Sequence, residues 1–306
     1  MRNARALWAV AKPVIGMLHA PALPGAPLHS DGRRTILDRV LGDAEALVRG
    51  GVHGLMLENF GDAPFFPGRV PPSVIAHLTW LAVEVRRRFD VPLGVNVLRN
   101  DGCAALAVAL AAGAQFIRVN VLCGARVADQ GILHGIAHDL LRDRAALGAR
   151  HIRIFADVAV KHSAPLGGER AVEDEVADLL HRGGADALIV SGAATGKPTD
   201  IERLRRVKAA AGRADVFVGS GVAPETVGEF LPYADGLIVG TSLKRRADAR
   251  AAVDLSRVRA LMRSWRLAAR LDGVTSAGGA SANRAPQSMA SGRPTRRGRA
   301  SAGENR

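Results

Sequence analysis

The sequence predicts an α/β protein folded as a single (β/α)8 TIM barrel. Short apolar runs alternate with longer amphipathic segments, and eight such pairs can be counted along the 306 residues. The hydrophobic share is 48% and the aromatic share only 4%, so Val, Leu, Ile and Ala are expected to build the core. Aliphatic runs of this kind are typical of parallel strands covered on both faces, and a chain of this length suits one barrel.

Each expected strand is a short apolar run that ends at polar or small residues. A helix between consecutive runs makes the strands parallel, because a parallel connection needs a long crossover. The eight expected strands are Val14–Leu18, Gly54–Leu57, Pro92–Val97, Gln115–Val119, Ile152–Ala156, Ala187–Val190, Val216–Val218 and Leu237–Val239.

The expected helices carry apolar residues every three or four positions and have recognisable ends. Gly50-Gly51 ends the first helix, Asp101 is placed to cap the third, and Thr199 with Glu202 has the form of a capping box. The helices are expected at Ile36–Arg49, Ile75–Phe89, Gly102–Ala112, Ile132–Leu147, Ala171–His181, 199–212, Pro224–Phe230 and Asp254–Leu271, and 122–131 is expected to be a loop.

Two features favour a barrel over a doubly wound open sheet. Similar segments of small residues, such as Gly50-Gly51-Val52-His53-Gly54 and Gly183-Gly184-Ala185-Asp186, precede the second, fourth, sixth and eighth strands. This quasi-repeat is what a barrel of two-unit modules would show. An open dinucleotide-binding sheet would carry G-x-G-x-x-G directly after the first strand, and the proline-rich loop after Leu18 lacks it.

Composition divides the chain into three segments: an N-terminal lead (1–12), the barrel (13–271) and a tail (272–306) rich in Arg, Ser, Gly and Ala. The tail has too few apolar residues to bury a core and is predicted to be disordered. It holds six Arg against two acidic residues, and the rest of the formal charge of +13 is spread over helix surfaces. A dedicated nucleic-acid surface is therefore not expected.

The two cysteines, Cys103 and Cys123, have no metal or redox spacing, which favours a reducing compartment. The apolar runs are too short for a signal peptide or for a membrane span of about twenty residues. We expect a cytoplasmic homo-oligomer, with any membrane contact peripheral.

Two glycine-containing strand ends predict a phosphate site. Gly219-Ser220-Gly221 follows the seventh strand and Gly240-Thr241-Ser242 follows the eighth, where barrels frequently bind phosphate. Glycine lets the backbone N–H groups approach an anion, a following helix N-terminus adds positive potential, and Lys244 could supply charge. The alternative is a pair of tight turns filled by small residues.

Proton-transfer candidates lie at the ends of the second and fifth strands. Glu58 and Asp157 could act as general bases or hold Mg²⁺. Glu58 could instead form a salt bridge to Arg99 or Arg118. Lys161 and His162 complete the catalytic set. A Schiff base at Lys161 is disfavoured, because Asp157 is expected to stabilise the charged amine.

Polar residues also end the other strands or follow them, which a purely structural rim would rarely require. We expect these to contact a ligand: His19, Asn59, Asn96, Arg99, Asn100, Arg118, Asn120, Asp129 and Ser191.

Several of these blocks, in this order, resemble the BtpA family, and the similarity runs from about Lys12 to Arg259. The carriers are Lys12–His19, Leu23-Pro24-Gly25, Glu58–Phe65, Gly94–Asp101, Phe116–Asn120, Asp129-Gln130-Gly131, Ala156-Asp157-Val158, Val160-Lys161-His162, Ser191-Gly192 with Thr195-Gly196, Gly219–Val222 and Val239–Lys244. The resemblance implies a fold similar to ribulose-phosphate-binding barrels. Members are described as photosystem I biogenesis factors peripheral to the thylakoid membrane, or as nucleoside triphosphatases, although this chain has no G-x-x-x-x-G-K-[ST] loop.

Two functions follow as hypotheses. The first is an enzyme that binds a small phosphorylated metabolite and acts as an isomerase, lyase or hydrolase by acid/base chemistry. The second is a non-enzymatic assembly factor that uses the surface of the barrel at a membrane.

Overall fold

Eight parallel strands close into a barrel, which confirms the fold class predicted from the sequence. The computed structural model describes residues 7–168, 170–192 and 199–271. Around the barrel the strands are β1 (Val14–His19), β2 (Gly54–Glu58), β3 (Leu93–Asn96), β4 (Phe116–Val119), β7 (Arg153–Val158), β9 (Ala187–Val190), β10 (Asp215–Val218) and β11 (Gly236–Val239), which pairs with β1.

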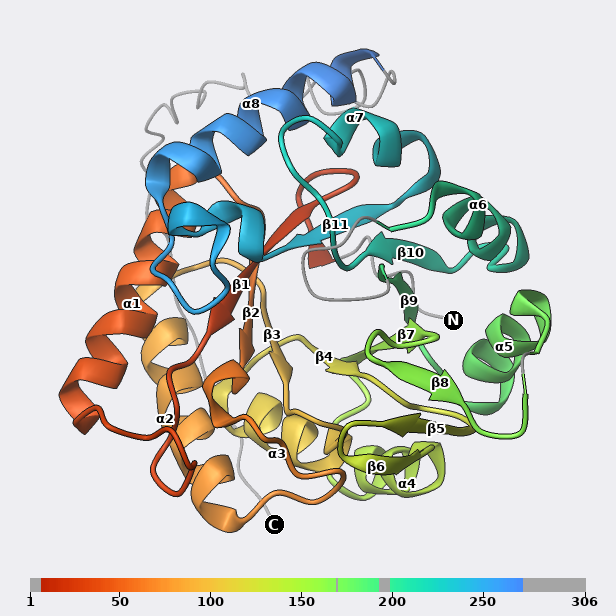
Figure 1. Ribbon diagram of the computed structural model, residues 1–306, viewed down its shortest axis with the longest axis horizontal. Coiled ribbons are helices and arrows are strands. Elements are labelled where there is room, and N and C mark those ends of the chain that lie inside the picture. The colour runs from red at the N-terminus through yellow and green to blue at the C-terminus, as the bar shows by residue number, and fades with distance from the viewer. Residues whose placement is uncertain (1–6, 169, 193–198, 272–306) are drawn as a thin grey trace, which may run out of the picture. The chain divides into compact units, whose positions relative to one another are not determined.

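Helices surround the strands (Figure 1). The α-helices of the described residues are α1 (Arg33–Gly50), α2 (Pro72–Arg88), α3 (Gly102–Ala112), α4 (Ala137–Ala146), α5 (Val172–Ala177), α6 (Ile201–Ala210), α7 (Val227–Phe230) and α8 (Leu255–Leu271). A π-helical turn, Asp178–Arg182, continues α5. The predicted cap at Asp101 is confirmed, because its carboxylate accepts the N–H of Ala104 at 2.9 Å.

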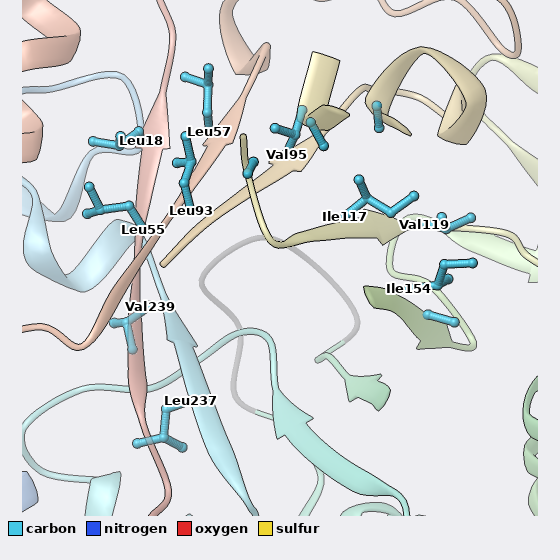
Figure 2. Close-up of a cluster of buried hydrophobic side chains, with 14 of the residues drawn as sticks. Leu18, Leu55, Leu57, Leu93, Val95, Ile117, Val119, Ile154, Leu237 and Val239 are labelled. Atoms are coloured by element: carbon cyan, nitrogen blue, oxygen red, sulfur yellow. The ribbon is translucent and has the colours of Figure 1, made fainter. Parts of the chain in front are cut away.

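Each strand sends alternate side chains outward to the helices and inward to the barrel axis. The outward residues are aliphatic and fully buried, and Figure 2 draws part of this layer, including Leu57, Val95 and Ile117. The inward residues form a separate cluster that lies nearer the amino-terminal ends of the strands. The inward and outward alternation continues to the last residue of each strand. It therefore also determines which polar side chains at the strand ends face the mouth of the barrel.

The interior cluster corrects the expectation of a wholly aliphatic core. Phe116, Phe155 and Phe217 stack in sequence, with ring centroids 4.8 and 4.9 Å apart. Gly94 makes room for one ring, since a Cβ there would lie 2.2 Å from Phe116. Trp8 packs edge-on against Phe116 at 5.7 Å, so the predicted lead contributes to the barrel interior. Four aromatic rings therefore fill this part of the barrel.

The segment after β4 differs from the prediction. Residues expected to be loop and the start of a helix instead form β5 (Ala125–Ala128) and β6 (Gly131–His134), an antiparallel hairpin. β8 (Ser163–Pro165), which follows β7, pairs with β5 to complete a small three-stranded sheet. Two loops on the carboxyl side of the barrel are thus joined by backbone hydrogen bonds.

The predicted capping box at the start of α6 is wrong by one position. Asp200 is the N-cap and accepts the N–H of Glu202 at 3.0 Å. Thr199 instead donates to the carbonyl of Ser220, which ties this helix to the loop after β10.

Some predictions concern residues that the structure does not describe, namely the tail 272–306 and the motif residues Thr195 and Gly196. Within the described residues, no helix is long and apolar enough to cross a membrane.

Candidate functional site

A row of polar side chains crosses four neighbouring strands at their carboxyl ends. The ladder pairs His19 with Glu58, Glu58 with Asn96, and Asn96 with Arg118. These residues share one face, because partners in a parallel ladder point the same way, and here that face is the barrel interior. All but His19 are at least nine-tenths buried, and His19 is nearly so. The predicted polar rim is therefore a continuous inner layer.

His19 and Glu58 form the centre of this layer. Nε2 of His19 lies 3.8 Å from Oε1 of Glu58, and Asn96 donates to Oε2 of Glu58 at 2.6 Å. Burial lowers the pKa of His19 to about 4, against the opposing effect of Glu58, so the ring is neutral at pH 7. Its Nδ1 lies 3.0 Å from the carbonyl of Ala249 and must carry the proton to donate there. Nε2 therefore presents a lone pair towards Glu58.

Asp157 is held by a buried network and does not face Glu58 freely. Arg118 donates to both of its oxygens, at 2.7 and 3.0 Å, and Asn120 donates to it at 2.5 Å. Among the described residues, Glu58 forms no ion pair with either predicted arginine, because Arg118 pairs with Asp157 and Arg99 donates to the carbonyl of Lys161. Oδ1 of Asn120 is buried and has no donor among the described residues. Arg118 also donates weakly to Ser191, at 3.4 Å.

The loops after β3 and β7 build one wall of the mouth. Arg99 donates to the carbonyl of Lys161 at 2.6 Å, which ties the two loops together. A cavity of about 330 Å³ lies here, lined by Glu58, Arg99, Arg118, Asn120, Asp129, Lys161 and His162 among others. Asp129 sits at the turn of the β5–β6 hairpin, on the rim. Burial, followed by the charge of Lys161, lowers the pKa of His162.

The two predicted phosphate loops come together on the opposite side. A cavity of about 140 Å³ is lined by Gly219, Ser220, Gly221, Gly240, Thr241 and Ser242, and also by His19, Glu58, Arg118 and Lys161. Within the described residues, the backbone N–H groups of Gly221, Val222, Thr241 and Ser242 have no hydrogen-bond acceptor. Unpaired N–H groups beside a cavity are suited to an anion.

Two expected sources of positive charge at these loops are absent. Lys244 is buried and turns away, with its ammonium 3.2 Å from Asp43, so it does not reach the cavity. The helices that follow the loops, α7 and the 3-10 turn Thr241–Leu243, have four and three residues. Such short helices have little macrodipole. Lys161 and Arg118 are the cations that line this cavity.

Two predicted ligand contacts instead serve the scaffold. The amide of Asn59 binds the backbone of Leu98 and the carboxylate of Asp62. The amide of Asn100 binds the backbone of Val121 and His134. Since these contacts use both ends of each amide, we leave Asn59 and Asn100 out of the proposed ligand contacts.

The donor set does not fit a resident divalent cation. Both oxygens of Asp157 accept hydrogen bonds from Arg118, and Glu58 is paired with Asn96. No cluster of three or more His, Cys, Asp or Glu side chains suited to a metal occurs in the part of the chain that the structure describes.

The structure adds residues that the sequence reasoning did not select. Phe60 stacks on His19 with centroids 4.3 Å apart and an interplanar angle of 15°. The sequence feature that could have indicated a role for Phe60 is its position directly after Glu58-Asn59. The loop after β11 supplies the carbonyl of Ala249 to His19 and places Arg250 at the larger cavity. Nothing in the sequence of this loop indicates that it folds over the mouth.

Comparison with known proteins shows which family this chain belongs to. The profile of the BtpA family matches residues 10–266. The chain belongs to the BtpA family. A BtpA relative, an uncharacterized protein from Thermococcus kodakarensis, is 44% identical over 251 residues, which is 82% of this chain and 94% of the relative. The photosystem I biogenesis protein BtpA from Synechocystis is 42% identical over 250 residues, covering 82% of this chain and 86% of that one.

Solved structures share the barrel of this BtpA chain. KGPDC from Streptococcus mutans has a TM-score of 0.51 at 14% identity, covering 84% of this chain and 98% of its own. Phosphoribosyl anthranilate isomerase from Thermococcus kodakaraensis has a TM-score of 0.50 at 14% identity, covering 83% and 99%. At this identity the likeness establishes a common fold and leaves the reaction open.

Proposed function

We propose that this BtpA-family protein binds a small phosphorylated metabolite in the barrel mouth and converts it by acid/base chemistry. One observation carries the proposal. The smaller cavity adjoins four N–H groups that have no acceptor in the described part of the chain, and it is also lined by a carboxylate, a neutral histidine and a lysine. An anion anchor and proton-transfer groups thus share a single space, which a pair of purely structural turns would not require.

The phosphate is assigned to the loops Gly219–Gly221 and Gly240–Ser242. A Cβ at Gly219 would lie 2.5 Å from Ile189 and 2.6 Å from Oγ of Ser191, so the backbone lies directly on the inner wall. Hydrogen bonds to a charged group contribute about 1.5–3 kcal/mol each. The hydroxyl of Ser242 already donates to Val222, which leaves Thr241 as the freer hydroxyl of that loop.

Glu58 and His19 are assigned the proton transfer. Their acceptor atoms lie 3.8 Å apart and both side chains line the smaller cavity, so a ligand hydroxyl or an acidic C–H in that cavity could meet either base. The negative charge that develops on the substrate is stabilised by Arg118, which lines the same cavity. Asp157 positions Arg118 through its two hydrogen bonds. This set suits an isomerase or a lyase.

The test is thermal stabilisation of the full chain by a panel of phosphate esters, with the dephosphorylated compounds as controls. Thr241→Asp introduces a negative charge at the proposed anchor, while Thr241→Val removes only the hydroxyl. We expect an ester to raise the Tm of the wild type and of Thr241→Val, and to leave that of Thr241→Asp unchanged. If no ester shifts the wild-type Tm, or if Thr241→Asp responds equally, the phosphate assignment fails.

A second candidate function is supported by one observation. The relative from Synechocystis, 42% identical across most of both chains, is named a photosystem I biogenesis protein. The corresponding proposal is a non-enzymatic assembly factor that contacts a membrane peripherally, whereas the enzyme would be cytoplasmic. Co-sedimentation with anionic vesicles distinguishes them: binding that depends on residues 272–306 supports the assembly role, and its absence removes this candidate.

A further inference from the structure

Among the lysines that the structure describes, Lys161 is distinguished by the lack of a partner for its ammonium group. The chain has only five lysines, of which Lys197 lies outside the described residues. Lys12 donates to a main-chain carbonyl, while Lys208 and Lys244 pair with aspartates. Among the described residues, the Lys161 ammonium has neither a hydrogen bond nor an ion pair, although it lines the mouth of the barrel. A structural role in the scaffold therefore does not account for it.

The backbone around Lys161 is held in an unusual conformation. Ala159 and His162 flank it with φ of 47° and 57°, in the left-handed region that disfavours residues with a side chain. Such backbone strain clusters at functional sites. Glu175 accepts the N–H of Ala159 at 2.8 Å, and Arg99 donates to the carbonyl of Lys161. These contacts fix the segment that presents the amine.

Lys161 lines both cavities of the mouth. The smaller cavity holds the proposed phosphate loops, and the larger one extends to Asn120 and Asp129. Glu58 and Arg118 also line both, so the amine, the base and a fixed cation border the same two cavities. A substrate anchored by its phosphate in the smaller cavity would place its neighbouring carbons beside the Lys161 amine.

The surroundings of Lys161 lower its pKa, contrary to the expectation from the sequence. Burial first, and then the charge of Arg118, lower the pKa of Lys161, while Glu58 and Asp157 act in the opposite direction. The sequence suggested that Asp157 would keep the lysine charged. Asp157 accepts hydrogen bonds from Arg118 and Asn120, and the positive charge of Arg118 offsets much of the effect of Asp157 on the pKa of Lys161.

We propose that Lys161 is a catalytic amine that forms an imine with a phosphorylated aldehyde or ketone. The neutral Nζ attacks the carbonyl carbon, a C–N bond forms, and the carbonyl oxygen becomes the hydroxyl of a carbinolamine. Two protons leave the nitrogen in all, and the oxygen departs as water after taking them up. Glu58, on the same cavities, is the group placed to carry these protons between nitrogen and oxygen.

This inference rests on the proposed function, since the phosphate loops place the carbonyl. It adds the substrate class and the bond that forms. The competing role for Lys161 is electrostatic, as a cation that only steadies the anion, and arginine could fill that role. An imine, in contrast, requires the primary amine of lysine.

The test is reductive trapping in the full-length protein. The chain is incubated with dihydroxyacetone phosphate or glycolaldehyde phosphate, reduced with sodium borohydride, and analysed by intact mass and peptide mapping. The expected adduct adds the mass of the probe less one oxygen atom and maps to Lys161. Lys161→Arg and Lys161→Met test the site, and Lys208→Arg is the matched control on the surface. We expect the adduct in the wild type and in Lys208→Arg, and its loss in both Lys161 variants.

The outcomes separate this inference from the proposed function. An adduct that persists in both Lys161 variants, or that maps equally to other lysines, overturns the assignment. Stabilisation by phosphate esters without an adduct overturns the imine and leaves phosphate binding intact. If neither stabilisation nor an adduct is found with any probe, the proposed function fails together with the inference.

Discussion

Replacing Arg118 by Met tests the buried network that positions the mouth. Arg118 donates to Asp157 at 2.7 and 3.0 Å, and the exposed fractions of the two side chains are 3% and 0%. The substitution keeps most of the side-chain volume but leaves a buried carboxylate with Asn120 as its remaining donor. Breaking such a pair from one side costs about 3–5 kcal/mol in the free energy of unfolding.

For a domain of this size each kcal/mol corresponds to about 2–4 °C, so the Tm is expected to fall by roughly 6–20 °C. The assay is thermal or urea unfolding followed by circular dichroism. The matched control is Arg206→Met, which removes an exposed pair with Glu173 at 3.0 and 3.1 Å and should leave the Tm nearly unchanged. If Arg118→Met loses no more stability than Arg206→Met, the reasoning about the buried pair is refuted.

Three further predictions concern stability. Because burial lowers the pKa of His19 to about 4, the unfolded chain takes up a proton that the folded chain refuses as the pH falls from about 6.5 to about 4. Between these pH values the wild type should therefore lose about 3 kcal/mol more of its free energy of unfolding than His19→Asn does. Urea unfolding of the variant should show a shallower dependence of this free energy on pH, and an unchanged slope would contradict the assignment. Gly94→Ala places a methyl group 2.2 Å from the Phe116 ring and should cost about 1–3 kcal/mol, whereas a wild-type Tm would mean that the ring moves freely. Asp200→Ala removes the cap of α6 and should cost about 1 kcal/mol in the free energy of unfolding; an unchanged value in urea unfolding would contradict the assignment of the cap to Asp200.

The barrel could be predicted because its signal is local and repeated. Each strand is a buried aliphatic run with a polar or small end, and each helix has an amphipathic stripe, so the order alone determines which ends share a face. The positions of the two loops proposed to bind phosphate could be predicted in the same way, as the ends of β10 and β11. Their two loops line one cavity, as the position after the last two strands implies.

The hairpin of β5 and β6 could not be predicted in this way. Ile132 and Leu133 look equally like the start of a helix or like strand residues, because short apolar runs carry no clear period. What decides is pairing: Val127 lies opposite Ile132 in β6 and opposite Ala164 in β8, and these partners are distant in sequence. A reading of one segment at a time contains none of this information.

The partners of the charged residues at the mouth also could not be predicted from the sequence. Lys244 closely follows the loop Gly240–Ser242, yet its buried side chain points away from the cavity and donates to Asp43 of α1. Asp157 and Lys161 are four positions apart, which suggested a pair, whereas Arg118 from the neighbouring strand takes the carboxylate. Proximity along the chain is a poor guide at the mouth of a barrel, where each loop meets side chains from several strands.

The most direct test of the central claim is a crystal structure of the full chain with dihydroxyacetone phosphate. We expect the phosphate to lie within hydrogen-bonding distance of the N–H groups of Gly221 and Thr241. The carbon chain should point towards Glu58 and Lys161. A phosphate bound elsewhere, or an empty mouth in crystals with saturating ligand, would contradict it.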